Sequence, residues 1–198
     1  QIAQVIVNIA GWDSAPLVGL CEVENARCLR DLCYRLRRFH YRYVHYESAD
    51  ERGIDVALLY DSTKIQVLRS QPVVVDLNGD VTRDVLYVSA LINKSDTLHT
   101  FMCHLPSQLG GAEASADKRF AAKRVIQHKV DSILSIHPHA YVVVMGDMNS
   151  NPQDDIRGMI NLMMNWDGVG YGTQKHQGTW SFLDQFYVSS ALRSQASA

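Results

Sequence analysis

Short apolar runs rich in β-branched and aromatic residues recur along the chain, and they constrain its fold more than any other feature. Runs of this kind predict strands. We expect the strands at residues 17–23, 42–47, 54–60, 64–68, 72–77, 84–92, 98–105, 140–147 and 180–188. The Leu-Asn-Gly-Asp sequence at 77–80 is typical of a hairpin turn.

Apolar residues three and four positions apart predict helices between these strands. The helices are expected at residues 2–9, 29–36, 113–136 and 153–164. In the third of them, the residues expected to face inward are Phe120, Ile126, Val130, Ile133 and Leu134. Because helices fall between pairs of strands rather than after every strand, we predict an α+β fold of two stacked mixed sheets covered by outer helices.

Composition sets limits on the class of protein. The chain has 198 residues, of which 46% are apolar, and a net charge of -2. It is therefore expected to form one domain without a strongly basic surface. The sequence at 27–43 is a local exception, rich in arginine and aromatic residues, although a solvated helix face is its simpler interpretation. No apolar run approaches the roughly 20 residues that span a membrane.

Two other classes of signal are missing from the sequence. The four cysteines form no Cys-X-X-Cys pair, which excludes a zinc ribbon. Cys21 and Cys103 lie in apolar runs and are expected to be small buried side chains. The first residues lack the basic start and long apolar centre of a signal peptide, so the sequence does not assign a compartment.

Polar side chains interrupt or end five of the apolar runs. They are Glu22, Asp55, His104, Asp147 with the nearby Asn149, and Asp184. Burying a carboxylate without a partner costs several kcal/mol. We therefore expect these side chains to converge on a metal, a partner or a substrate. Gly146, just before Asp147, would let a ligand approach the backbone closely.

Each of these residues alone also has a structural interpretation. Asp147 and Asn149 are typical of a turn or of a helix N-terminus. His104 could be a hydrogen-bonded structural histidine, and Glu22 could pair with an arginine of the following helix. The remaining two carboxylates could be ordinary turn or strand-end residues. The recurrence of the same polar types in five apolar settings favours a shared site.

The chemistry open to such a set is narrow. Oxygen ligands without cysteine favour Mg²⁺ or Mn²⁺ over zinc. A carboxylate beside an amide can orient a water and a phosphoryl oxygen together, and a histidine can stabilise the phosphorus centre or protonate a leaving group. The residues therefore indicate metal-assisted phosphoester hydrolysis.

Five motifs also carry a resemblance to a known family. In order along the chain they read VGLCEVEN, ERGIDVALLY, CHLPSQLGG, VVVMGDMNSNP and GTWSFLDQFYVS. The chain resembles the endonuclease/exonuclease/phosphatase (DNase-I-like) superfamily, and within it a branch known from Bacteroides-type genomes. This resemblance implies a single domain over residues 1–198 with a four-layer α/β/β/α sandwich.

The resemblance implies a role for each candidate residue. Glu22 would bind the metal. Asp147 would activate the attacking water, and Asn149 would hold the phosphate. His104 would contact the scissile phosphate with the support of Asp55. Asp184 would orient a second histidine. The substrate would be a phosphoester, in a nucleic acid, a phospholipid head group or a sugar phosphate. The oligomeric state is left open.

The sequence also departs from the family pattern. Cys103 and Gln108 stand where the related branch has Asn and Arg, and both changes are expected to weaken phosphate contact. The family's first strand with its asparagine and its last strand with Ser-Asp-His are not found in residues 1–198. These departures favour an alternative, a catalytically weak or inactive binding domain that retains the fold.

Overall fold

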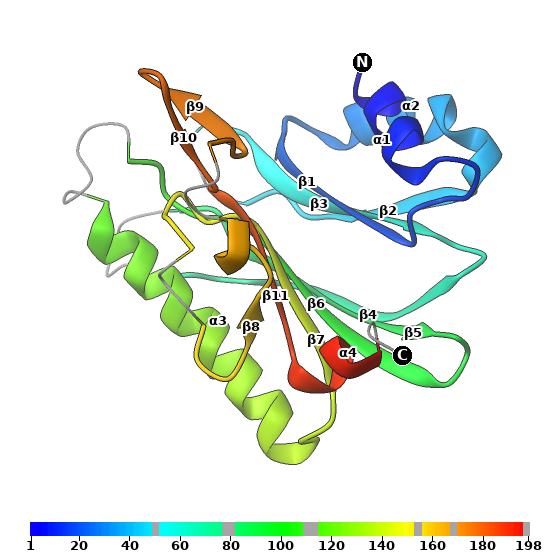
Figure 1. The fold of residues 1–198 in the computed structure, drawn as a ribbon. Coiled ribbons are helices and arrows are strands. Elements are labelled where there is room, and N and C mark those ends of the chain that lie inside the picture. Colours follow the sequence, from blue (N-terminus) through cyan, green and yellow to red (C-terminus); the bar gives the residue numbers. More distant parts are fainter. Residues whose placement is uncertain (49–51, 77–81, 109–114, 153–155, 167–169, 196–198) are drawn as a thin grey trace.

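The computed structural model describes residues 1–48, 52–76, 82–108, 115–152, 156–166 and 170–195. Two β-sheets stack face to face, and helices cover both outer faces (Figure 1). The predicted α+β four-layer sandwich is therefore confirmed. The hairpin turn expected at 77–80 lies outside the described residues. No helix among the described residues is long and apolar enough to cross a membrane.

The smaller sheet has three antiparallel strands in the order β1 (Leu17–Val23), β3 (Asp55–Asp61) and β2 (Tyr41–His45). Two amphipathic helices cover its outer face, α1 (Ile2–Ala10) and α2 (Ala26–Arg35). Ile6 of α1 and Leu29 of α2 pack there in one cluster with Leu59 of β3. The side chain of Asn25 accepts hydrogen bonds from two N–H groups of the first turn of α2, which fixes where that helix begins.

The larger sheet has six strands. Their order is β4 (Ile65–Val73), β5 (Val85–Ile92), β6 (Asp96–His104), β7 (Tyr141–Asp147), β11 (Asp184–Val188) and β8 (Ile160–Asn161). Among the described residues only β6 and β7 pair in parallel, and the other strand pairs of this sheet are antiparallel. The long helix α3 (Ala116–Ile136) connects β6 to β7 and covers the outer face (Figure 1).

The inward face of α3 differs from the expectation at one residue. Ala122, Ile126 and Val130 are buried against the sheet, as their spacing of four predicts. Phe120 does not belong to this row, and its side chain is 64% exposed. The expectation that Phe120 faces inward was therefore wrong, because the buried Arg119 takes the inward position in that turn.

A second apolar layer lies between the two sheets. Val56 and Leu58 of β3 meet Val88, Met102 and Met145 of the larger sheet there. In this packing β1 lies over β7 and β3 lies over β6. The stacking therefore brings one end of β1 close to the corresponding ends of β6 and β7.

The helix expected at 153–164 is wrong over the residues that the structure describes. A turn at 157–158 is followed by the short strand β8 and the 3-10 helix η2 (Met164–Trp166). Gly158 has a φ of 81°, which lies outside the helical region. Asn161 is buried and donates to the carbonyl of Pro152 and to the side chain of Gln185, which holds β8 at the sheet edge.

Two strand predictions also need correction. The run at 64–68 and the first two residues of the run at 72–77 belong to one strand, β4, whereas residues 74–76 form no strand. Pro72 is tolerated because β4 is an edge strand. The run at 180–188 divides into β10 (Thr179–Ser181) and β11. β10 pairs with β9 (Gln174–His176) in a hairpin that the sequence did not predict. The short helices η1 (Arg37–Phe39) and α4 (Ser190–Gln195) complete the fold.

Gly146 has a packing role in the structure, and its predicted role of admitting a ligand remains a prediction. It is paired in register with Cys103 on the neighbouring strand β6. A Cβ atom at position 146 would lie 1.8 Å from the carbonyl oxygen of Cys103, and the φ of Gly146 is 137°. Only glycine therefore lets β6 and β7 approach each other at the end of the pair.

We expect Gly146→Ala to lower the free energy of unfolding by about 2 kcal/mol or more, from backbone strain together with the collision. Urea unfolding followed by circular dichroism measures this change. Gly11→Ala is the matched control, because Gly11 has a φ of 67° but open space around its Cβ position. If Gly146→Ala costs no more than Gly11→Ala, the close approach of the two strands is not a constraint on stability.

Candidate functional site

Three of the predicted polar residues stand side by side at one end of the larger sheet. β6 and β7 are parallel, and His104 is paired in register with Asp147. β11 is antiparallel to β7, and Asp184 is paired in register with Asp147 from the other side. Because side chains alternate along a strand, His104 and Asp147 share the face of Met102 and Met145, which is turned toward the smaller sheet.

Glu22 reaches the same place from the smaller sheet. It lies near the end of β1, which stacks over β7, and the register with β3 shifts between Leu20 and Val23. Glu22 sits in this irregularity with a φ of 58°, which is uncommon for a residue with a side chain. Among the described residues no arginine of α2 forms an ion pair with Glu22, so the structural interpretation of this residue is not supported.

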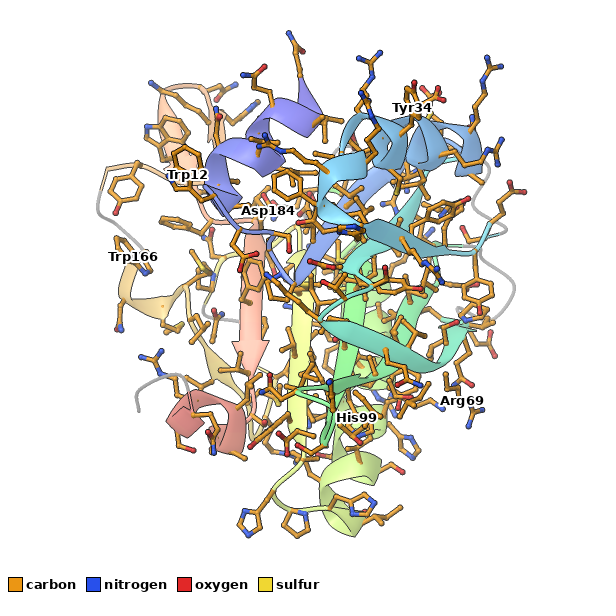
Figure 2. All side chains as sticks on the ribbon, turned by 90° about the vertical axis from the view of Figure 1, so that its right-hand side faces the viewer. Trp12, Tyr34, Arg69, His99, Trp166 and Asp184 are labelled. Carbon is orange, nitrogen blue, oxygen red and sulfur yellow. The ribbon has the colours of Figure 1, made fainter. Side chains whose placement is uncertain are left out.

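Burial differs among the four residues. His104 is 6% exposed and Asp147 is half-buried, whereas Glu22 and Asp184 are exposed. Glu22 and Asp184 therefore keep contact with solvent although they belong to apolar runs. They stand where the apolar layer between the sheets ends. Figure 2 shows Asp184 at the end of β11 that is nearer to the helices α1 and α2.

Asp147 is held by its neighbours in a defined orientation. One carboxylate oxygen accepts the backbone N–H of Asn149 at 2.8 Å, and the other lies 3.7 Å from Nε2 of His104. Burial raises the pKa of Asp147, and the charges of Asp184 and Glu22 raise it further, against the opposing effects of the Asn149 N–H and Arg83. Glu22 and Asp184 therefore lie near enough to Asp147 for their charges to act on its carboxyl group.

Asn149 is positioned by the loop that follows β7. Its side chain is buried, and its amide nitrogen donates to the carbonyl of Leu105 at 2.9 Å. Its backbone has a φ of 46°, and its carbonyl accepts a hydrogen bond from the side chain of Gln108. Asp147 and Asn149 thus form the turn that the structural interpretation predicted, and Gln108 stabilises it. One hydrogen of the Asn149 amide is left for another acceptor.

Arg83 is a residue of this site that the sequence analysis missed. Its side chain is buried just before β5, and its Nε donates to the carbonyl of His104 at 3.1 Å. Its positive charge lowers the pKa of Asp147. A basic residue directly before a buried strand, in the sequence Thr-Arg-Asp-Val, was the available signal.

Asp55 has a separate set of partners. Its carboxylate accepts hydrogen bonds from the backbone N–H and the hydroxyl of Ser48. The neighbouring Asp84 has a raised pKa because of burial and the charge of Asp55. The structure therefore places Asp55 in a buried polar group at the start of β3, and its support of His104 remains a prediction.

The two cysteines near the site do not provide a nucleophile. Burial raises the pKa of the Cys21 thiol to about 12, so this side chain is neutral at physiological pH. Cys103 is fully buried in the core beneath α3, and its thiol donates to the carbonyl of Met145. Its side chain therefore packs in that core rather than at the cleft.

The chain was compared with protein families, with curated proteins and with solved structures. A family model described as the endonuclease/exonuclease/phosphatase family matches residues 1–198. A comparison with curated proteins finds no match.

Solved structures with the same fold are similar over most of the chain. Truncated TDP2 of Caenorhabditis elegans is 19% identical with a TM-score of 0.70, over 95% of this chain and 74% of that one. Its longer form is matched over 57% of its length. A mannosyl-6-phosphatase of Bacteroides thetaiotaomicron is 14% identical with a TM-score of 0.68, over 96% of this chain and 75% of that one. ANGEL2, a 2′,3′-cyclic phosphatase, is 16% identical with a TM-score of 0.62, over 76% of this chain and 43% of that one.

At these identities the structural matches establish the fold, and the family model covers the whole sequence with its ordered motifs. The chain belongs to the endonuclease/exonuclease/phosphatase family.

Proposed function

We propose that this protein hydrolyses phosphoesters with the help of a divalent cation, Mg²⁺ or Mn²⁺, and a water activated by Asp147. One observation carries the proposal. The register of β6, β7 and β11 aligns His104, Asp147 and Asp184 at one edge, and β1 adds Glu22 from the opposite sheet. A histidine among three carboxylates suits attack of water on a phosphorus centre.

Asp147 is the proposed general base. Its raised pKa makes the carboxylate a stronger base than an ordinary aspartate, while the hydrogen bond from Asn149 holds it in place. An attacking water beside the free lone pairs of Asp147 would transfer a proton to this carboxylate as its oxygen bonds to phosphorus. The alcohol oxygen of the ester would leave on the opposite side.

His104 and Asn149 are the proposed contacts to the phosphoryl oxygens. The Nε2 atom of His104 is turned toward Asp147, so an N–H there points into the site. The remaining amide hydrogen of Asn149 supplies a second donor from the adjacent loop. Donors fixed in advance stabilise the charge that develops on these oxygens.

The residues present fit a hard cation such as Mg²⁺ or Mn²⁺ better than zinc. The described residues contain no group of three or more His, Cys, Asp or Glu side chains close enough to hold a metal ion among themselves. Mg²⁺ is commonly held by one or two carboxylates while it keeps several waters. Glu22, exposed beside Asp147 and Asp184, would hold such an ion. The ion would supply positive charge to the phosphate and lower the pKa of bound water.

The substrate class is also part of the proposal. Two proteins with this fold are a mannosyl-6-phosphatase and a 2′,3′-cyclic phosphatase. Both hydrolyse phosphate esters, and they support a phosphoester of a sugar or nucleotide as the substrate of this chain. A panel of chromogenic phosphomonoesters, phosphodiesters and nucleotides with Mg²⁺ or Mn²⁺ would identify the class.

Asp147→Asn should lower kcat by about a hundredfold or more, the size expected for loss of a general base, and should leave KM nearly unchanged. Asn can still accept the hydrogen bond from the Asn149 N–H, so the loop is preserved. Asp131→Asn is the control, because Asp131 lies on the exposed side of α3 beside Arg157. Equal activity of Asp147→Asn and the native protein would remove Asp147 from the mechanism.

The proposed metal ligand can be tested without turnover. Mg²⁺ that binds only the folded protein raises its melting temperature. We expect this rise in the native protein and in Glu24→Gln, and we expect it to be reduced in Glu22→Gln. Glu24 is an exposed glutamate two residues further along. The same Mg²⁺ response in both variants would show that Glu22 does not hold the ion.

The raised pKa of Asp147 predicts how stability depends on pH in the absence of metal. A pKa above the unfolded value of 3.8 means that folding favours the protonated carboxyl. The stability it contributes is complete below that unfolded value and is lost as pH rises through the folded-state pKa. In EDTA, Asp147→Asn should therefore melt at a higher temperature than the native protein at pH 7, and this difference should shrink toward pH 4. A lower melting temperature of the variant at pH 7 would contradict the raised pKa.

A further inference from the structure

The outer layer over the smaller sheet carries a concentrated positive charge. Residues 27–42 contain six arginines, no lysine and one acidic residue, Asp31. The whole chain has 19 basic and 21 acidic residues, so this stretch carries +5 and the rest of the chain carries -7. Such a separation of charge within a protein of net charge -2 indicates a polyanionic partner for this face.

The arginines of the stretch are exposed and available to a ligand. They are Arg27, Arg30, Arg35, Arg37, Arg38 and Arg42. On a merely solvated helix face, charges of opposite sign usually pair at a spacing of four residues. Asp31 stands at that spacing from both Arg27 and Arg35, yet among the described residues none of the six arginines forms an ion pair.

Aromatic rings are interleaved with these arginines. Tyr34 is 70% exposed and projects from α2 at the surface of the molecule (Figure 2). The guanidinium of Arg37 lies 5.1 Å from the centre of the Tyr34 ring, and that of Arg38 lies 4.4 Å from the centre of the Phe39 ring. An open hollow of about 330 Å³ lies between α2 and β2. It is lined by Arg30, Cys33, Tyr41, Arg42, Tyr43 and Tyr60.

This combination distinguishes among polyanions. Guanidinium groups bind phosphate in a bidentate manner, and planar rings provide surfaces on which unpaired bases stack. A lipid surface would require apolar side chains around the charges for insertion. The exposed ring of α2 is Tyr34 in its last turn, and the hollow beside it is lined by arginines and tyrosines with one cysteine. The exposed apolar side chains of this outer layer, Ile2, Val5 and Ile9, lie on α1 and outside the arginine stretch. The chemistry therefore favours nucleic acid with accessible bases.

The position of the face connects it to the candidate site. Asn25, which caps α2, follows Glu22 by three residues, and α2 runs from that end of β1 across the outer layer (Figure 1). A strand lying along α2 would therefore have one end near the cleft.

We propose that the arginine–aromatic face, formed by residues 27–43 with Tyr60, binds single-stranded nucleic acid through its phosphates and unpaired bases. This binding surface goes beyond the proposed function, because it acts through residues outside the cleft and requires no hydrolysis. It gives the basic stretch at 27–43, which the sequence analysis treated as a solvated helix face, a binding role.

The first experiment measures binding in EDTA, so that it is independent of catalysis. Fluorescence anisotropy with a labelled oligo-deoxythymidine of about 15 nucleotides gives the affinity, which should fall steeply with salt. Arg37→Glu/Arg38→Glu should weaken binding about tenfold or more. The control Arg124→Glu/Lys129→Glu changes the net charge equally on α3, where Arg124 also lies over a ring, that of Phe120. The control should change affinity by less than about twofold.

A second experiment tests whether bases take part. An oligomer of the same length and charge but without bases should bind several-fold more weakly, and Tyr34→Ala should remove part of that difference. The melting temperature of each variant tests whether it is folded. The dependence of the native protein's affinity on salt concentration is a measurement that needs no variant. Equal loss in both charge-reversal variants, equal binding of the base-free oligomer, or tighter binding to phosphatidylserine vesicles than to the oligonucleotide would overturn the proposal.

Discussion

The parallel pairing of β6 with β7 is the interaction on which the candidate site depends. Its register sets His104 beside Asp147, and the pairing of β7 with β11 adds Asp184 in the same row. The pairing is close at this end, because the backbone of Gly146 lies against the carbonyl of Cys103. A shift by one residue would turn Asp147 into the core beneath α3 and bring Met148 to the cleft. The chemistry of the site is thus tied to the register of one strand pair.

The division of polar and apolar surface follows from the same geometry. Along β7, Val142 and Val144 face α3, while Val143 and Met145 face the other sheet. The inner face therefore remains apolar until Asp147, where the strand ends. Carboxylates gathered at this edge repel one another, and that repulsion together with burial raises the pKa of Asp147. A cation in the cleft would offset this repulsion, so the cost to stability and the capacity to bind metal have the same origin.

Much of this arrangement could be predicted from the sequence, and the failures have identifiable physical causes. Strands with strong β-branched character, such as β7, and the residues at their ends were predicted correctly in position. The helix expected at 153–164 failed because the pattern did not weigh the backbone conformation of Gly158 against apolar spacing. The packing role of Gly146 could not be predicted from β7 alone, because the carbonyl oxygen of Cys103 that excludes a side chain there belongs to β6.

Arg83 was missed because its contact with His104 joins positions 21 residues apart in the chain. The basic stretch at 27–43 was visible in the sequence, but only the fold shows that its arginines form no ion pair among the described residues.

The central claim is that the edge formed by β1, β6, β7 and β11 is the place where metal and phosphate bind. A crystal structure of the protein with Mn²⁺ and inorganic phosphate tests it most directly, because the anomalous signal of manganese locates the ion independently of the protein. The account predicts an anomalous peak within coordination distance of the Glu22 carboxylate, with phosphate beside His104 and Asn149. Manganese and phosphate found together at any other part of the molecule, with this edge free of both, would contradict it.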